Sequence, residues 1–283
     1  MQISQVASRQ DVLILHNVAV LFRARHQFDP FINETMQRPE FHHKFGTPGP
    51  VILPVIHVVD EARTAANIDH VVKAGLKGCF LINHDFGIEP FLPIITAIRG
   101  RYPDLWIGVN FLAVTGLDAF PVLADLQAHG VRIDAYWADD ARIDEAASTQ
   151  TEADSIAATR RDCGWDGLYF GGTAFKKQRP VDPRDYGRAA RIAGGYMEVV
   201  TTSGIATGQS ADLGKLAQFR AALADRPIAL ASGITPDNAG DYAMVDCFMV
   251  ATGINFEGDF YNIDPARLAR LVDVCREMGE NHD

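Results

Sequence analysis

Eight short apolar runs rich in β-branched residues recur along the chain, roughly 20 to 35 residues apart. Runs such as PVILPVIHVV and CFMVA are apolar at nearly every position, as expected of parallel strands covered on both faces. The spacing leaves room for one helix and two short loops after each strand. The expected strands are residues 51–59, 78–83, 106–112, 133–137, 167–170, 197–202, 228–231 and 247–251.

Between these runs, apolar residues recur at helical spacing, and Gly or Pro follows most of the helical segments. Asp264 before Pro265 is typical of a helix N-terminus, because Pro is well tolerated at the first helical position. Ser210, with Asp212 two residues later, indicates another helix start. The expected helices are residues 62–74, 90–98, 118–128, 151–163, 185–194, 210–224 and 265–278.

Alternating strands and helices fit either an open doubly wound sheet or a closed barrel. Eight units, without a Gly-x-Gly-x-x-Gly motif after the first strand, favour an α/β fold of the (β/α)8 TIM-barrel type. Such a barrel takes about 250 residues, and the chain has 283. We therefore expect the barrel over residues 50–283. Residues 1–49 are expected to form an N-terminal helical and irregular extension packed on it, with a helix at residues 11–25.

The formal net charge of −10 disfavours nucleic acid and anionic membranes as partners, and no run of Lys and Arg forms a basic patch. No apolar stretch reaches the ~20 residues of a membrane span, and the N-terminus does not resemble a signal peptide. We therefore expect a cytoplasmic protein. The cysteines lie far apart without a Cys-x-x-Cys pair, which is typical of free thiols: Cys79, Cys163, Cys247 and Cys275.

Small residues gather after the last three strands, in TTSGIATGQ, ASGITPDN and ATGINFEGDF. Backbone N–H groups bind phosphate well where small residues let the chain approach the oxygens, and this part of a barrel often binds phosphate. Helices starting at Asp237 and after the last strand would add their N-termini. Tight turns alone are the alternative reason for the glycines. The candidate phosphate-binding residues are Thr202, Gly204, Gly208, Ser232, Gly233, Thr252 and Gly253.

His57, late in the first strand, and Lys176, after the fifth, are candidates for the chemistry. An imidazole exchanges protons near pH 7, although a histidine in an apolar strand is often simply a buried residue. Lys176 suits a countercharge for phosphate better than an imine, unless it belongs to a solvated basic cluster. Tyr136 and Trp137 offer rings for stacking on a base or sugar, with one of the two expected in the core.

Polar residues after the second and third strands complete the candidate set. His84 and Asp85 cannot easily both face inward, because side chains alternate along a strand. A metal site of His57, His84 and Asp85 is an alternative that no characteristic ligand spacing supports, so no metal ligand is assigned. The candidate catalytic residues are His57, Asp85, Asn110 and Lys176, and Asn83 is expected to contact the ligand.

These motifs resemble the BtpA/SgcQ family of TIM-barrel proteins. The resemblance covers about residues 51–272 and implies a barrel enzyme related to phosphate-binding barrels, in a family whose activity is poorly defined. One branch is linked to photosystem I biogenesis and another to sugar-phosphate operons. The segments that carry it are VILPVIHVV, AGLKGCFLINHDFGIEPF, IGVNFLAV, FGGTAFKK, VVTTSGIATGQSADLGKL, LASGITPDN and DCFMVATGINFEGDFYNIDPARLARLV.

The chain departs from the family pattern after the fifth strand, where the family tends towards a run like ADVHVKH. Gly172 and Ala174 replace its Asp and first His, while Lys176 keeps its Lys. Asn255 stands where the family often has Lys after the eighth strand. These departures favour a divergent subgroup with altered chemistry, or a binding protein that has lost catalysis.

The sequence therefore predicts an enzyme acting on a small phosphorylated metabolite of the sugar-phosphate or nucleotide (phosphoribosyl) type. Isomerase, lyase and phosphoribosyltransferase-like reactions all stay open. The alternative is a non-catalytic metabolite-binding or assembly factor of the BtpA type. The residues require no cofactor, although a divalent metal is a further alternative. Association into a homodimer or higher oligomer is left open.

Overall fold

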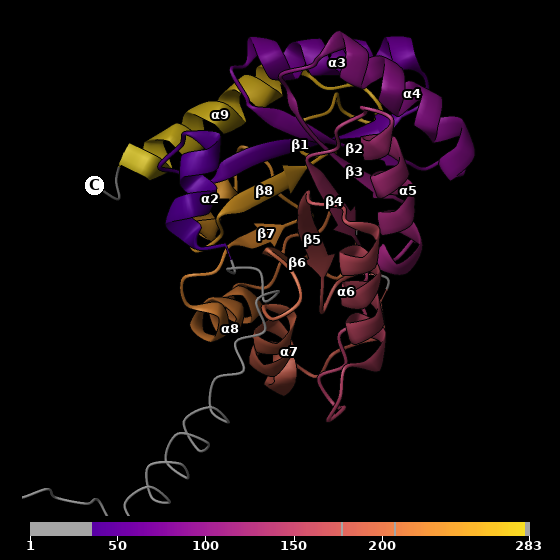
Figure 1. Cartoon of the computed structure of the whole chain (residues 1–283). Helices are drawn as coiled ribbons and strands as arrows, with labels where there is room; N and C mark the ends of the chain where they lie inside the picture. Colours follow the sequence, from indigo (N-terminus) through magenta and orange to yellow (C-terminus); the bar gives the residue numbers. More distant parts are fainter. Residues whose placement is uncertain (1–35, 177, 207, 281–283) are drawn as a thin grey trace, which may run out of the picture. The chain divides into compact units, whose positions relative to one another are not determined.

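The structure is a computed structural model that describes residues 36–176, 178–206 and 208–280. The helix expected at residues 11–25 lies outside these ranges. Within them, eight parallel strands pair in sequence order, and β8 pairs with β1, so the sheet closes into a barrel (Figure 1). The predicted (β/α)8 fold is confirmed. The strands are β1 (Val51–Val58), β2 (Gly78–Asn83), β3 (Trp106–Phe111), β4 (Ala135–Ala138), β5 (Leu168–Gly172), β6 (Val199–Thr202), β7 (Ile228–Leu230) and β8 (Cys247–Val250).

Helices follow most strands and surround the barrel (Figure 1). Carboxylates cap several of them: Asp60 accepts a hydrogen bond from the backbone N–H of Arg63, and Asp264 from that of Ala266. The cap of α8 is Asp212 rather than the expected Ser210, so the helix begins at Leu213. The α-helices are α2 (Arg38–Phe45), α3 (Glu61–Lys73), α4 (Ile88–Arg101), α5 (Gly116–Ala128), α6 (Thr151–Cys163), α7 (Tyr186–Ala193), α8 (Leu213–Leu223) and α9 (Pro265–Glu280).

The connections after β7 and β8 differ from the expected helices. A 3-10 turn, η2 (Ala239–Tyr242), follows β7, because the side chain of Asn238 accepts from the N–H of Thr235 and donates to the carbonyl of Gly233. These bonds close a turn where a longer helix was expected. Between β8 and α9, the described chain holds an antiparallel bridge, Asn255 to Ile263, and no helix. No helix N-terminus therefore points at the predicted phosphate site from this segment.

Side chains alternate between the barrel interior and the helix layer, as the period of a strand requires. In β1, Val51, Leu53 and Val55 belong to the interior cluster, whereas Ile52 and Ile56 pack against the helices. The same alternation between the barrel interior and the helix layer continues past the last apolar residue of each strand. It decides which polar side chains reach the cavity at the C-terminal ends.

Helix α2 covers the N-terminal end of the barrel. Phe45 meets Trp106 edge-on, with ring centroids 5.2 Å apart, and Phe41 is fully buried. Below them, the fully buried carboxylate of Asp246 accepts a hydrogen bond from Arg38 Nε at 2.6 Å. Aromatic rings and an ion pair thus close this end. How the whole predicted extension, residues 1–49, packs on the barrel stays a prediction, since only its last part is described.

In the part of the chain that the structure describes, no helix combines the length and the apolar character needed to cross a membrane. The cysteines there carry no disulfide.

Candidate functional site

A cavity of about 320 Å³ opens at the C-terminal ends of the strands. Val55 of β1, Ile82 of β2 and Met249 of β8 form an apolar floor, one inward-facing layer below the polar side chains. This volume lies at the lower end of the range for small-molecule sites. The cavity suits a small metabolite.

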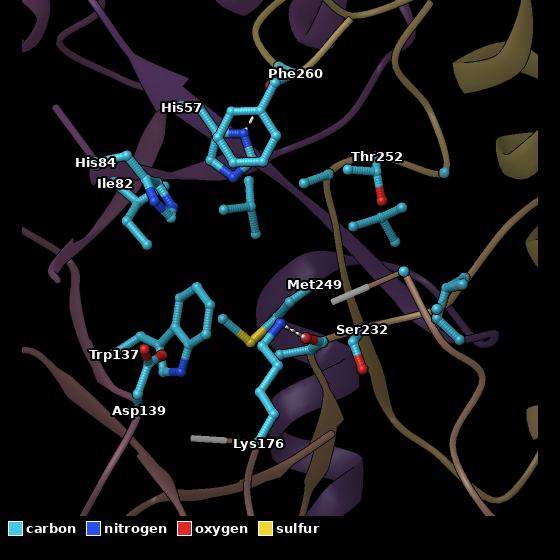
Figure 2. Close-up of a pocket in the computed structure, with 18 of the residues that line it drawn as sticks. His57, Ile82, His84, Trp137, Asp139, Lys176, Ser232, Met249, Thr252 and Phe260 are labelled. Carbon is cyan, nitrogen blue, oxygen red and sulfur yellow. Dashed lines mark hydrogen bonds between the residues drawn. The ribbon is translucent and has the colours of Figure 1, made fainter. Parts of the chain in front are cut away.

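Polar side chains enter this cavity from four sides, as two pairs that each lie on opposite walls. His57 lies late in β1 and Lys176 follows β5; these strands are four places apart in a ring of eight, so the side chains enter from opposite walls. Trp137 and Asp139, in and after β4, lie opposite Thr252, which follows β8. Figure 2 shows His57 across the cavity from Lys176, and Trp137 and Asp139 across it from Thr252.

The imidazole of His57 is buried and held by the loop after β8. Its Nδ1 lies 2.7 Å from the carbonyl oxygen of Phe260, so Nδ1 carries the proton and Nε2 is left as an acceptor. The ring of His84 meets it edge-on, with centroids 4.7 Å apart. Burial lowers the pKa of His57 to about 4, although the hydrogen bond to Phe260 acts in the opposite direction. His57 is therefore a neutral proton acceptor at physiological pH.

Lys176 connects the loops after β5, β6 and β7. Its backbone N–H donates to Ser203 Oγ at 2.8 Å, and its Nζ donates to the carbonyl of Ala231 at 3.2 Å. The Nζ also lies 5.7 Å from the centroid of the Phe175 ring. The ammonium thus stands at the cavity wall beneath the β7 loop, where it can meet an anionic oxygen of a ligand.

A second lysine, Lys215 of α8, fixes the loop that carries Lys176. Lys215 is only 6% exposed, and its Nζ donates to the carbonyls of Ala174 and Ser203. Ala174 has a φ of 45°, a left-handed conformation that is unfavourable for a residue with a side chain. Burial lowers the pKa of Lys215 to about 8. Lys215 therefore ties the β5 loop to the β6 loop.

The loops after β6, β7 and β8 meet through their glycines. The N–H of Gly204 donates to Ser232 Oγ at 2.8 Å, which joins the first two loops. Gly233 has a φ of 71°, and a Cβ there would overlap the carbonyl oxygen of Gln209. A Cβ on Gly253 would overlap a backbone carbonyl of the β7 loop. The three loops therefore form one continuous rim, and close backbone approach requires the glycines.

Some backbone N–H groups of this rim are left available to donate hydrogen bonds to a ligand. Among residues 36–176, 178–206 and 208–280, none accepts a hydrogen bond from the N–H of Gly233, Thr252 or Gly253. Such groups in one concavity are what phosphate oxygens bind. The predicted phosphate-binding residues that line the cavity are Gly208, Ser232, Gly233, Thr252 and Gly253.

Two polar residues predicted after β2 are engaged beside the cavity rather than in its wall. Asn83 Nδ2 donates to the carbonyl of Phe86 at 2.5 Å, and its Oδ1 accepts from the N–H of Leu112 at 3.0 Å. Asp85 accepts from the hydroxyl of Tyr261 at 3.0 Å. In this structure both residues hold loops, and a direct ligand contact for either stays a prediction.

Three further predicted residues lie behind the cavity wall. Thr202 Oγ1 donates to the carbonyl of Ala174 at 3.3 Å, and Gly204 lies behind Ser232. Asn110 Nδ2 donates to Asp139 Oδ1 at 3.2 Å. Asn110 therefore does not line the cavity itself, but it holds the carboxylate of Asp139, which does.

His84, Trp137, Asp139 and Phe260 line the cavity but are not among the catalytic and ligand-binding residues chosen from the sequence, where Trp137 was only one of two rings considered for stacking and His84 only a ligand of the alternative metal site. Strand alternation could have identified three of them: His84 continues the inward series of β2, and Asp139 continues the series of Trp137 in β4. Phe260 has no such signal, because it lies in an irregular loop and reaches His57 only in the folded barrel.

The alternative metal site is not formed. Among the described residues, no group of three or more His, Cys, Asp or Glu side chains is arranged to hold a metal ion. His57 and His84 face the cavity, whereas Asp85 bonds to Tyr261.

No protein-family model matches this sequence, and no curated protein matches it. Solved structures match most of the chain at low identity. A structure described as native KDPGal is 14% identical with a TM-score of 0.56, covering 81% of this chain and 96% of that one. The tryptophan synthase alpha chain from Legionella pneumophila subsp. pneumophila is 16% identical with a TM-score of 0.55, covering 87% and 98%.

Phosphoribosyl anthranilate isomerase from Thermus thermophilus is 13% identical with a TM-score of 0.52, covering 81% of this chain and 99% of that one. At such identities the likeness shows the fold alone. This chain therefore shares the architecture of these TIM-barrel proteins.

Proposed function

We propose that this protein is an enzyme that acts on a small phosphorylated metabolite. The phosphate binds to the N–H groups of the rim formed by the loops after β6, β7 and β8. The observation that carries the proposal is the meeting of these glycine-containing loops beside a cavity that also holds His57 and Lys176. With the phosphate group bound at the rim, the rest of the metabolite lies between His57 and Lys176.

His57 and Lys176 are suited to proton transfer next to a carbonyl group. Nε2 of His57 is unprotonated at neutral pH and accepts a proton from carbon or a hydroxyl group. The ammonium of Lys176, on the opposite wall, stabilises negative charge that develops on the carbonyl oxygen. Isomerisation and aldol-type cleavage both need this pair of roles. Phosphoribosyl transfer would use Lys176 as a charge partner without the proton transfer.

One solved structure of this fold is phosphoribosyl anthranilate isomerase, whose name implies a phosphorylated substrate, and this supports such a substrate here by analogy. The resemblance of the sequence to the BtpA/SgcQ family supports the same class. The first is an analogy of fold and the second a resemblance of sequence motifs, so the residues at the rim carry the proposal.

Isothermal titration of the full chain with ribose 5-phosphate tests the phosphate handle. Thr252→Asp puts a negative charge at the rim, whereas Thr252→Asn has a similar shape without the charge. We expect binding by the wild type and by Thr252→Asn, and a loss of affinity of at least about tenfold in Thr252→Asp. Equal affinities of the two variants, or no binding by the wild type, would contradict the proposal.

A metabolite-binding protein without turnover is the second candidate. It is favoured by Gly172 and Ala174, which stand where the resembling family has Asp and His. NMR of ribose 5-phosphate in heavy water separates the candidates by exchange of the hydrogen next to its carbonyl carbon. Exchange that is lost in His57→Gln and Lys176→Met supports the enzyme; binding without exchange supports the second candidate.

A further inference from the structure

Asn255 lies in the loop after β8, behind the cavity wall, and is only 3% exposed. Its side-chain Nδ2 donates to the carbonyl oxygen of Phe260 at 3.0 Å. The same oxygen accepts from Nδ1 of His57 at 2.7 Å. A backbone carbonyl has two lone pairs, so these two donors use its full capacity. The amide of Asn255 and the imidazole of the proposed base are therefore joined through one oxygen atom.

The backbone of Asn255 is itself fixed. It forms the antiparallel bridge with Ile263 that closes the loop, and its carbonyl accepts from Nη1 of Arg267 at 3.2 Å. The side-chain amide therefore reaches from an anchored position to the carbonyl of a residue further along the same loop. A change of the Asn255 side chain removes the bond to Phe260 and leaves these backbone contacts in place.

A second buried amide, Asn67 of α3, holds the neighbouring peptides of this loop. Its Nδ2 donates to the carbonyl of Tyr261 at 2.8 Å, and its Oδ1 accepts from the N–H of Ile263 at 2.9 Å. Asn67 thus fastens the loop to the helix layer. The direction of the Phe260 carbonyl depends on Asn255, which is the side chain that bonds to that oxygen together with His57.

The direction of this carbonyl decides which nitrogen of His57 can act as a base. A neutral imidazole carries one N–H, and in water the proton favours Nε2. A carbonyl oxygen can only accept, so an oxygen held against Nδ1 keeps the proton on Nδ1 and leaves the lone pair on Nε2. With the proton on Nε2 instead, that nitrogen would be a donor and could not take a proton from a ligand in the cavity that His57 lines.

We propose that Asn255 is a positioning residue for His57. By holding the Phe260 carbonyl against Nδ1, Asn255 keeps the imidazole in the tautomer whose Nε2 accepts a proton. The effect on the tautomer stands on these two hydrogen bonds, and its consequence for catalysis rests on the proposed function.

Nitrogen-15 NMR of the histidine rings in the full chain at neutral pH tests the inference, because protonated and unprotonated ring nitrogens give well-separated signals. His57→Gln identifies the His57 signals by their loss. We expect the wild type to carry the proton on Nδ1. Asn255→Leu removes the donor with a side chain of similar size, and the ratio of the two tautomers should move about fivefold towards Nε2–H, the effect of about one hydrogen bond.

Asn262→Leu is the matched control, because it removes an amide of the same loop that bonds to Asp259 and not to Phe260. It should keep the wild-type tautomer ratio. Thermal unfolding identifies a variant that does not fold, and Asn255→Ala then takes the place of Asn255→Leu. A proton on Nε2 in the wild type would overturn the inference without any variant. An unchanged ratio in a folded Asn255 variant, or an equal shift in Asn262→Leu, would overturn it as well.

Hydrogen exchange of ribose 5-phosphate in heavy water separates this inference from the proposed function. Asn255→Leu should lower kcat for exchange about fivefold and leave KM unchanged, because the tautomer of the base changes and the phosphate rim does not. If the tautomer shifts but the wild type neither binds nor exchanges the sugar phosphate, the proposed function is wrong and the positioning role stands. If the wild type exchanges it and the tautomer of Asn255→Leu is unchanged, the inference is wrong and the proposed function survives.

Discussion

His57 and Phe260 are held together in two ways, although 203 positions separate them in the chain. Nδ1 of His57 donates to the backbone carbonyl of Phe260 at 2.7 Å, and the two rings stack with centroids 3.8 Å apart. The backbone bond fixes which nitrogen carries the proton, and the aromatic ring covers the imidazole. The loop after β8, which contributes Thr252 to the proposed phosphate rim, therefore also sets the protonation state of the proposed base.

Replacing Phe260 with Leu should raise the pKa of His57. Burial is the main cause of the lowered pKa, and the smaller side chain uncovers the imidazole while the backbone carbonyl keeps its hydrogen bond. An NMR titration of the His57 ring signals should give a midpoint of about 4 in the wild type and a value closer to 6.5 in the variant. An unchanged midpoint would mean that the Phe260 ring is not the source of the burial.

The buried His57 should also make the protein less stable in mild acid. The unfolded residue binds a proton near pH 6.5 and the folded one only near pH 4, so between these values the unfolded state binds more protons. The free energy of unfolding should therefore fall as the pH drops through this window. This group contributes on the order of 3 kcal/mol to the fall.

Urea unfolding of the wild type and of His57→Gln at several pH values measures this contribution. The variant should show a shallower dependence on pH between pH 6.5 and 4. His129→Gln, at an exposed position, is the control and should keep the wild-type slope. Parallel curves for the wild type and His57→Gln would show that the folded residue titrates normally.

Gly253→Ala should destabilise the barrel by about 1–3 kcal/mol, because the added Cβ overlaps the backbone of the β7 loop and neither side is a flexible side chain. Gly100→Ala in α4 is the matched control: a Cβ there meets nothing within 4 Å, and Ala favours a helix by roughly 0.5–1 kcal/mol over Gly. Denaturant unfolding should move the two variants in opposite directions. A neutral Gly253→Ala would mean that the loops of the rim do not pack as closely as described.

Asp246→Asn should be severely destabilising. The fully buried carboxylate accepts from Arg38, His42 and Arg220, and its loss leaves buried positive charge without a partner at a cost of about 3–5 kcal/mol. Asp273→Asn, which breaks an exposed pair with Arg276, should change stability by no more than about 0.5 kcal/mol. Similar effects in the two variants would show that the Asp246 cluster does not hold the N-terminal end of the barrel.

The sequence predicts the barrel well because strand-forming runs and helix signals recur with one spacing. The close packing of the loops after β6, β7 and β8 also follows from local chemistry, because their small residues allow the backbones to approach each other closely. To decide which of two neighbouring polar residues faces the cavity, one must know which positions of the strand point into the barrel. His84 faces the cavity and Asn83 and Asp85 do not, and this follows from the inward position of Phe80 and Ile82 in β2.

Other features depend on contacts between distant segments, which no local pattern reveals. Lys215 looks like an ordinary surface lysine of an amphipathic helix, yet it is buried beneath two loops and binds the carbonyls of Ala174 and Ser203. The turn after β7 replaces the expected helix because the side chain of Asn238 satisfies two backbone groups of its own loop. The stacking of Phe260 on His57 likewise exists only once the barrel is closed.

A crystal structure of the full chain with ribose 5-phosphate is the most direct test of where the ligand binds. We predict phosphate oxygens within hydrogen-bonding distance of the N–H groups of Gly233 and Gly253, with the rest of the sugar between His57 and Lys176. Phosphate bound beside Asp139, or outside the cavity altogether, would contradict the assignment of the rim.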